Sequence, residues 1–170
     1  ALAQIRRALK PDGLFLAAMF GGETLRELRT ALTNSELEQT GGIHPRISPF
    51  ADVRDAGGLL QRAGFALPVV DLDDIPVSYA EPLKLMLDLR GMGETNSVLA
   101  RSLKFTRPAT LLEAAAHYKE MYTDGDGRIP ATFQVIFLTA WAPHESQQQP
   151  LKPGQSKARL ADALDTEEHS

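Results

Sequence analysis

The 170-residue chain contains no cysteine. This absence excludes disulfides, thiolate metal sites and cysteine nucleophiles, and it is typical of a reducing compartment. No apolar run approaches the roughly 18 residues of a membrane-spanning helix, and no basic-plus-apolar signal segment opens the chain. Positive charge is not in excess, because 18 Lys and Arg against 22 Asp and Glu give a net charge of −4. We therefore expect no membrane span and no nucleic-acid partner.

Several short motifs that carry chemistry are also missing. The sequence has no G-x-G-x-x-G fingerprint and no H-E-x-x-H metal motif, and no Ser-His-Asp order supports hydrolase chemistry. Asp124-x-Asp126-Gly127 matches part of a calcium loop, but Tyr122 and Phe133 stand where the first and last carboxylates belong. A turn is the favoured interpretation, and we predict no metal site.

What is present is typical of a globular domain, with 43% apolar and 24% charged residues. A short amphipathic helix at 2–9 leads through a Pro-Asp-Gly turn into an uncharged strand, Leu14–Phe20, and a further helix follows. This order is typical of the middle of an α/β sheet. We therefore expect earlier strands to precede Ala1, and the bare edge of strand 14–20 to pair with another chain.

The rest of the chain alternates between predicted helices and strands. The uncharged segment Ala131–Trp141 is apolar on both faces, which predicts a central strand. The other expected elements are a helix at 23–32, a loop at 33–49, a helix that starts at Ser48-Pro49 and stops at Gly64, strands at 65–72 and 75–79, helices at 82–91 and 107–122, and a flexible tail at 143–170 with at most a short helix at 156–164.

Three loops hold the candidate site residues. Phe20, Gly21 and Gly22 stand where a strand hands over to a helix, so they form either a plain tight turn or the wall of a ligand cleft. His44 and Arg46 lie in a glycine-rich loop, a place where functional residues are common. The loop at 91–96 is either a connector or a lid, since glycines permit movement. Its candidate residues are Met92, Glu94 and Asn96. Arg46 is suited to hold an acidic group, and Glu94 to orient a donor.

Several stretches resemble known proteins. Leu9-Lys10-Pro11-Asp12-Gly13 followed by a strand resembles the helix and fifth strand of class I S-adenosylmethionine-dependent methyltransferases. More specific blocks resemble the methyltransferase-like assembly factors of respiratory complex I and their bacterial relatives. They are more distantly similar to the biotin-pathway methyltransferases that esterify a malonyl carrier protein. These blocks are 18–25, 47–50, 91–96, 121–122, 130–134 and 144–147.

The resemblance implies an α/β fold that is the C-terminal half of a Rossmann-like methyltransferase sheet. Leu14–Phe20 is then strand five, 65–72 strand six and 133–141 an antiparallel strand seven inserted between them. A helical cap at about 81–122 belongs to the same partial domain, 1–142, and the tail at 143–170 follows.

In this family the cofactor S-adenosylmethionine is bound by loops after strands one to four, so no cofactor ligand is assigned in this chain. We expect the chain to bind no cofactor tightly and to be inactive alone, although the intact protein uses S-adenosylmethionine. The alternative is a non-catalytic or protein-modifying assembly module, with a respiratory complex subunit as its partner. The expected location is the bacterial cytoplasm, with mitochondria left open. Substrate, reaction type and oligomeric state also stay open.

Overall fold

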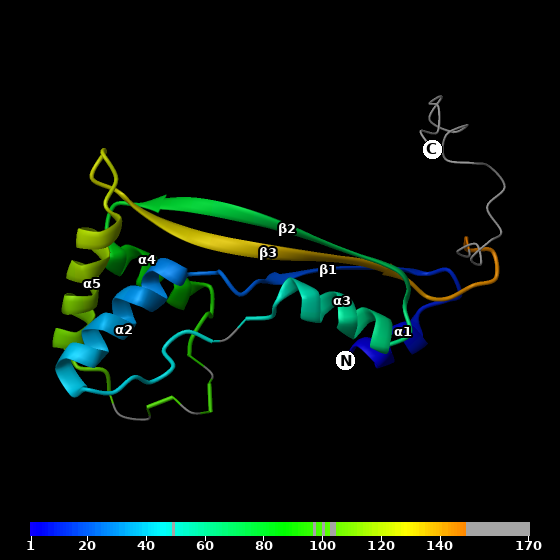
Figure 1. Cartoon of the computed structure of the whole chain (residues 1–170), viewed down its shortest axis with the longest axis horizontal. Coiled ribbons are helices and arrows are strands. Elements are labelled where there is room, and N and C mark those ends of the chain that lie inside the picture. The colour runs from blue at the N-terminus through cyan, green and yellow to red at the C-terminus, as the bar shows by residue number, and fades with distance from the viewer. Residues whose placement is uncertain (49, 97, 100, 103–104, 149–170) are drawn as a thin grey trace, which may run out of the picture.

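A three-stranded sheet runs the length of the protein (Figure 1). The computed structural model describes residues 1–48, 50–96, 98–99, 101–102 and 105–148. The strands β1 (Leu14–Phe20), β2 (Ala66–Tyr79) and β3 (Ile129–Trp141) are arranged in the order β1-β3-β2, and β3 is antiparallel to both neighbours. The predicted α/β class and the central place of the last strand are confirmed.

The strand β2 is longer than the sequence predicted. We expected two extended pieces separated at Asp73-Asp74, but pairing with β3 continues without a break from Val69 to Tyr79. The prediction was wrong because Asp73 and Asp74 are exposed in an edge strand, where carboxylates remain hydrated. Charge therefore marks β2 as an edge strand, whereas the uncharged β3 lies at the centre.

The helices α1 (Leu2–Ala8) and α3 (Val53–Arg62) lie on one side of the sheet (Figure 1). We expected α3 to begin at Ser48-Pro49, but Pro49 lies outside the described residues and α3 begins at Val53. Its N-cap is Asp52, whose carboxylate accepts a hydrogen bond from the Arg54 N–H at 2.7 Å. These helices and the sheet enclose one hydrophobic core, whose buried members are Ala56, Leu60, Phe65, Ile136, Leu138 and Ala140.

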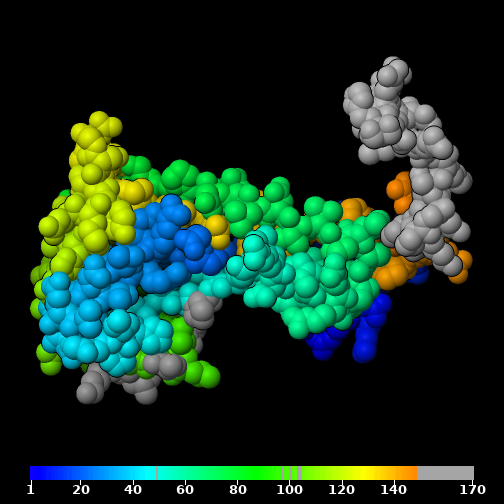
Figure 2. All heavy atoms as spheres, viewed as in Figure 1, coloured from blue at the N-terminus to red at the C-terminus, as the bar shows by residue number. Residues whose placement is uncertain are grey.

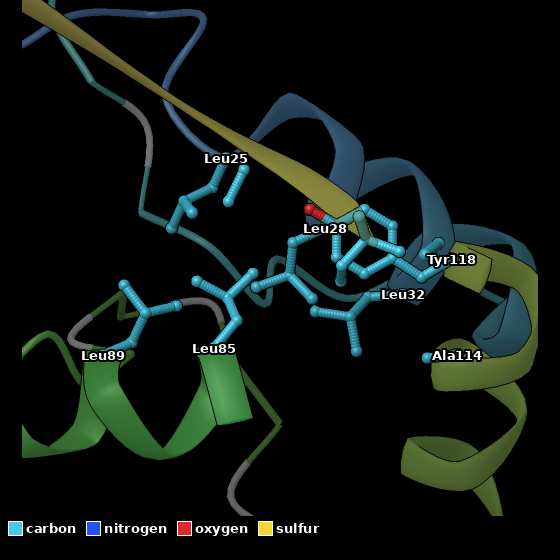
Figure 3. Packing of buried hydrophobic residues seen from close by; sticks show 10 residues of the cluster. Leu25, Leu28, Leu32, Leu85, Leu89, Ala114 and Tyr118 are labelled. Carbon is cyan, nitrogen blue, oxygen red and sulfur yellow. The ribbon is translucent and has the colours of Figure 1, made fainter. Parts of the chain in front are cut away.

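A second core lies at the other end of the sheet, between α2 (Arg26–Thr40), α4 (Pro82–Gly91) and α5 (Pro108–Tyr122) (Figure 1). The space-filling view shows the atoms of α2 (blue) and α5 (yellow-green) next to each other at this end of the molecule (Figure 2). Leucines of α2 and α4 point toward one another, and Ala114 and Tyr118 of α5 close the cluster (Figure 3). The fully buried Tyr118 hydroxyl donates to the Pro130 carbonyl at 2.7 Å.

The helix α2 extends well beyond the predicted end at residue 32. We expected a loop from Thr33, yet Ser35 is buried and its hydroxyl donates to the Thr110 carbonyl of α5 at 2.8 Å. This contact stabilises a polar segment whose local propensity favours a loop. The helix ends at Gly41, whose φ of +66° suits a left-handed C-cap.

A buried polar network joins the start of α2 to β3. The Glu27 carboxylate accepts hydrogen bonds from the Thr132 N–H at 3.1 Å and the Thr132 hydroxyl at 2.5 Å. The Thr24 hydroxyl donates to the Gln134 carbonyl at 3.0 Å and accepts from the Gln134 N–H at 3.1 Å. The Gln134 side-chain oxygen accepts from the Glu23 N–H at 3.2 Å. Because these buried groups satisfy one another, they fix α2 on the central strand.

The described part of the predicted tail, 143–148, stays close to the sheet, since the Gln147 amide donates to Asp12 at 2.8 Å and to the Ala142 carbonyl at 2.9 Å. The predicted short helix at 156–164 lies outside the described residues. Within the described ranges, none of the helices is long and apolar enough to span a membrane. The division into a partial domain with a cap at about 81–122 stays a prediction.

We expect Gly21→Ala to destabilise the protein by about 1–3 kcal/mol. A Cβ at Gly21 would lie 2.6 Å from the side-chain oxygen of Gln134, which would have to leave its position in the network. Gly22→Ala is the matched control, because a Cβ there meets just the Ala51 carbonyl oxygen at 3.9 Å. Urea unfolding measures both free energies. Equal stability of the two variants would contradict this assignment.

Candidate functional site

A cavity of about 180 Å³ lies between α2, α4 and the loops that contain Arg46 and Glu94. The structure thus brings together Arg46, Glu94 and Asn96, three of the five candidate residues that the sequence analysis placed in the glycine-rich loop and the loop at 91–96. The floor is apolar and the rim polar. The floor residues include Leu25, Leu28, Leu32, Met86 and Leu89, and the rim residues include Arg46, Ser48, Arg90, Glu94, Thr95 and Asn96.

The glycine-rich loop is held by Glu36, a residue that the sequence analysis missed. Its side chain is 3% exposed, and one carboxylate oxygen accepts the His44 N–H at 2.7 Å. The other oxygen accepts the Arg46 guanidinium at 2.7 Å and lies 3.3 Å from His44 Nδ1. The signal was present, since Leu28, Leu32 and Glu36 are spaced by four and share one face of a helix. We missed Glu36 because we predicted a loop at 33–49, where the structure continues the helix to Thr40.

The charges of Glu36 and Arg46 compensate each other. Burial raises the pKa of the Glu36 carboxyl, but the His44 N–H and the Arg46 guanidinium outweigh burial, so the pKa lies below its usual value of 4.5. Glu36 is therefore ionised at neutral pH. Arg46 also donates to the Thr106 hydroxyl at 2.6 Å, while its buried Nε has no hydrogen-bond partner. Two guanidinium nitrogens of Arg46 thus already donate hydrogen bonds within the chain.

The loop at 91–96 is tied to the glycine-rich loop by Asn96. The Asn96 amide donates to the Pro45 carbonyl at 2.7 Å, so the two predicted site loops are in contact. Among the described residues the Glu94 carboxylate has no ion pair, and it faces the cavity rim. Met92 is 57% exposed and is not part of the cavity lining. His44 lines two further hollows, which Arg46 also lines.

The turn at Phe20-Gly21-Gly22 is engaged inside the chain. The Phe20 ring packs edge-on against Phe50, a residue of the cavity lining, at a centroid distance of 5.8 Å. The Gly22 carbonyl accepts both terminal nitrogens of Arg29 at 3.2 Å. The Glu23 N–H donates to the Gln134 side-chain oxygen at 3.2 Å, so this N–H and the Gly22 carbonyl are both hydrogen-bonded within the chain. Phe20 does not line the cavity itself but packs against Phe50, which does.

One further cluster joins α2 and α5. Ligand atoms of Glu38, Glu113 and His117 lie within 4.8 Å of one another, although the sequence predicted no metal site. Glu38 and His117 are 3.2 Å apart and form a pair, and Glu113 accepts the Gln39 amide. These contacts account for the cluster as a set of helix–helix interactions.

Comparison with known proteins identifies close relatives. The chain is 51% identical to the arginine-hydroxylase NDUFAF5, mitochondrial, of Danio rerio over 162 residues, which are 95% of this chain and 50% of that protein. It is 51% identical to the human protein of the same name over 91% of this chain and 44% of the relative. The malonyl-[acyl-carrier protein] O-methyltransferase of Nitrosospira multiformis is 36% identical over 82% of this chain and 43% of the relative. No protein-family model matches.

The resemblance predicted from the sequence blocks is therefore confirmed. Identities near 50% extend over almost the whole chain, and the chain spans about half the length of the curated relatives it matches. The strand order, with an antiparallel strand between two others, is the one expected for part of a methyltransferase sheet. The chain is thus a relative of the class I methyltransferase-like proteins, more similar to the NDUFAF5 arginine-hydroxylases than to the carrier-protein methyltransferases.

Proposed function

We propose that this chain is the substrate-binding part of a methyltransferase-like protein that acts on a side chain of a partner protein. The cavity between α2, α4 and the two site loops carries the proposal, because three predicted site residues line it. An apolar floor under a polar rim suits a long side chain with an aliphatic stem and a polar end. The chain would hold and orient the group that is modified.

The cofactor site is proposed to belong to other parts of the intact protein. Two observations support this. The sequence has no glycine-rich cofactor turn, and the Gly22 carbonyl and the Glu23 N–H are hydrogen-bonded within the chain. S-adenosylmethionine would supply the methyl group in a methyltransferase of this kind. The residues of this chain would bind the substrate and exclude water from it.

We expect the isolated chain to bind no S-adenosylmethionine at micromolar concentrations. Equilibrium dialysis with the labelled cofactor measures this directly, and the full-length Nitrosospira multiformis relative serves as the positive control. Micromolar binding by the isolated chain, with the fold intact by circular dichroism, would refute the proposed division between cofactor and substrate parts.

An arginine side chain is the substrate that the charges of the cavity favour. The relatives with the higher identities are named arginine-hydroxylases. Arg46 is neutralised by Glu36, and Arg90 is exposed to water, so Glu94 is the carboxylate left on the rim for a cationic group. A carboxylate is the usual partner of a guanidinium group, which it binds through paired hydrogen bonds.

We expect a peptide that contains arginine to bind more tightly than the same peptide with neutral citrulline, and Glu94→Gln to remove this preference. Because Glu94 is exposed, the loss is about 1 kcal/mol, or about fivefold in affinity. Fluorescence anisotropy measures both peptides. Glu120→Gln, the same change on an exposed face of α5, is the control. Equal binding of the two peptides by the unmodified chain would exclude this role for Glu94.

Glu36 is proposed as a positioning residue that holds the loop of His44 and Arg46 in place for the substrate. Its lowered pKa means that its stabilising effect is fully present above about pH 4.5 and is lost as the pH falls through the folded-state value. The ionised Glu36 carboxylate therefore stabilises the fold at neutral pH.

We expect Glu36→Gln to cost about 2–3 kcal/mol at pH 7, because Arg46 loses its counter-charge. The difference from the unmodified chain shrinks below about pH 4.5. Urea unfolding at pH 7 and pH 3.5 tests this. Glu38→Gln is the control on the same helix, since the Glu38 side chain is 56% exposed. A difference that does not vary with pH would show that the Glu36 charge has no such role.

The proposed partner is a protein subunit of a respiratory complex, and the proposed location is the bacterial cytoplasm. The similarity to bacterial carrier-protein methyltransferases supports that location. The NDUFAF5 relatives are mitochondrial by name, which supports mitochondria as the alternative. A non-catalytic assembly role is the second candidate function. Capture of the same partner by the unmodified chain and by Glu94→Gln would favour it over a catalytic role.

A further inference from the structure

The contacts between α2 and α5 also bring three metal-ligand atoms together. Glu38, Glu113 and His117 each contribute one such atom, and these atoms lie within 4.8 Å of one another. Glu38 belongs to α2, whereas Glu113 and His117 belong to α5. Residues four apart share one face of a helix, so both side chains of α5 are directed toward α2. The set combines one imidazole with two carboxylates.

The distance between His117 and Glu38 is close to that between two ligands of one ion. The Nε2 atom of His117 lies 3.2 Å from a carboxylate oxygen of Glu38. A charge-assisted hydrogen bond between nitrogen and a carboxylate oxygen is usually about 2.7–2.9 Å long. Two ligand atoms bound at about 2.0–2.1 Å to a tetrahedral zinc ion lie roughly 3.3 Å apart. The observed distance is nearer to the value for two metal ligands.

The two carboxylates have too little positive charge beside them. In the part of the chain that the structure describes, Glu113 forms no ion pair and Glu38 pairs with His117 alone. The cluster therefore keeps a net negative charge whether the imidazole is neutral or protonated. Carboxylates at this distance repel each other. A divalent cation between them would remove the repulsion.

Polar contacts behind the cluster orient Glu113. The Gln39 amide donates to one carboxylate oxygen of Glu113, and the Thr110 hydroxyl donates to the Gln39 side-chain oxygen at 2.7 Å. The Ser35 hydroxyl in turn donates to the Thr110 carbonyl at 2.8 Å. Hydrogen bonds of this kind fix the direction of a metal ligand and are typical of metal sites. The second oxygen of Glu113 accepts no hydrogen bond from a described residue.

We propose that Glu38, Glu113 and His117 bind a divalent transition-metal ion of the zinc class, which joins α2 to α5. Zn²⁺ accepts imidazole nitrogen and carboxylate oxygen as ligands and takes a water molecule where the protein supplies three of them. The imidazole disfavours Mg²⁺ and Ca²⁺, which prefer oxygen ligands. The sequence analysis predicted no metal site because Glu38 stood in a predicted loop, away from the helix of His117.

This site is separate from the proposed function. None of its three ligands lines the cavity near Glu94, so failure of metal binding and failure of the proposed function are distinguishable. The chain spans about half the length of its relatives, but an ion needs no large open surface. All three ligands belong to α2 and α5, so the site does not depend on what other segments of an intact protein cover.

Calorimetric titration of the 170-residue chain with zinc chloride tests the site. We expect one Zn²⁺ per chain with a micromolar Kd, and a higher urea midpoint in the presence of zinc, because the ion binds the folded state. His117→Gln keeps a polar partner for Glu38 but removes the imidazole, and Glu113→Gln removes a charged ligand. Each should weaken binding by more than about tenfold, since even residues that orient a ligand contribute that much.

His144→Gln is the matched control, because His144 is an exposed histidine that contacts Ser146 and lies outside the cluster. It should bind zinc as the unmodified chain does. The absence of binding tighter than millimolar, or binding that survives both His117→Gln and Glu113→Gln, would overturn the proposal. Equal loss in His144→Gln, or equal binding of Mg²⁺, would also overturn it, because zinc would then be held elsewhere or by charge alone. Circular dichroism establishes that each variant is folded.

Discussion

The hydrogen bonding of β3 is the constraint on which the rest of the structure depends. This strand supplies the backbone partners of both β1 and β2, and its Thr132 and Gln134 also anchor the start of α2. The two hydrophobic cores lie at opposite ends of the molecule and share this one strand. Because its polar groups are buried, their mutual satisfaction fixes a single arrangement.

The candidate site follows from that anchorage. Because the start of α2 is hydrogen-bonded to β3, the C-terminal part of α2 places Glu36 next to the loop of His44 and Arg46. Asn96 then links this loop to the loop that follows α4. The cavity is therefore assembled from segments that are distant in sequence. The charge of its rim depends on ion pairing, since Glu36 neutralises Arg46 and the Glu94 carboxylate forms no ion pair with a described residue.

The sequence predicted the elements whose signals are local. The uncharged run in β1 and the longer one in β3 identified both strands, and apolar residues on both faces of β3 predicted its central position. Proline at the start of α4 and α5 marked where these helices begin. Motif blocks identified the methyltransferase-like relationship, and loop position was enough to select Arg46, Glu94 and Asn96 as candidates.

The sequence by itself thus determined where the strands lie, the family, and the loops that carry the candidate residues. Each of these is determined by residues that are neighbours in the sequence. The tertiary structure alone decided the length of α2, the continuity of β2 and the role of Glu36. Ser35 is helical because Thr110 accepts its hydroxyl, and Glu36 is ionised in a buried place because His44 and Arg46 surround it. Contacts between distant segments override local propensity, and no local pattern encodes them.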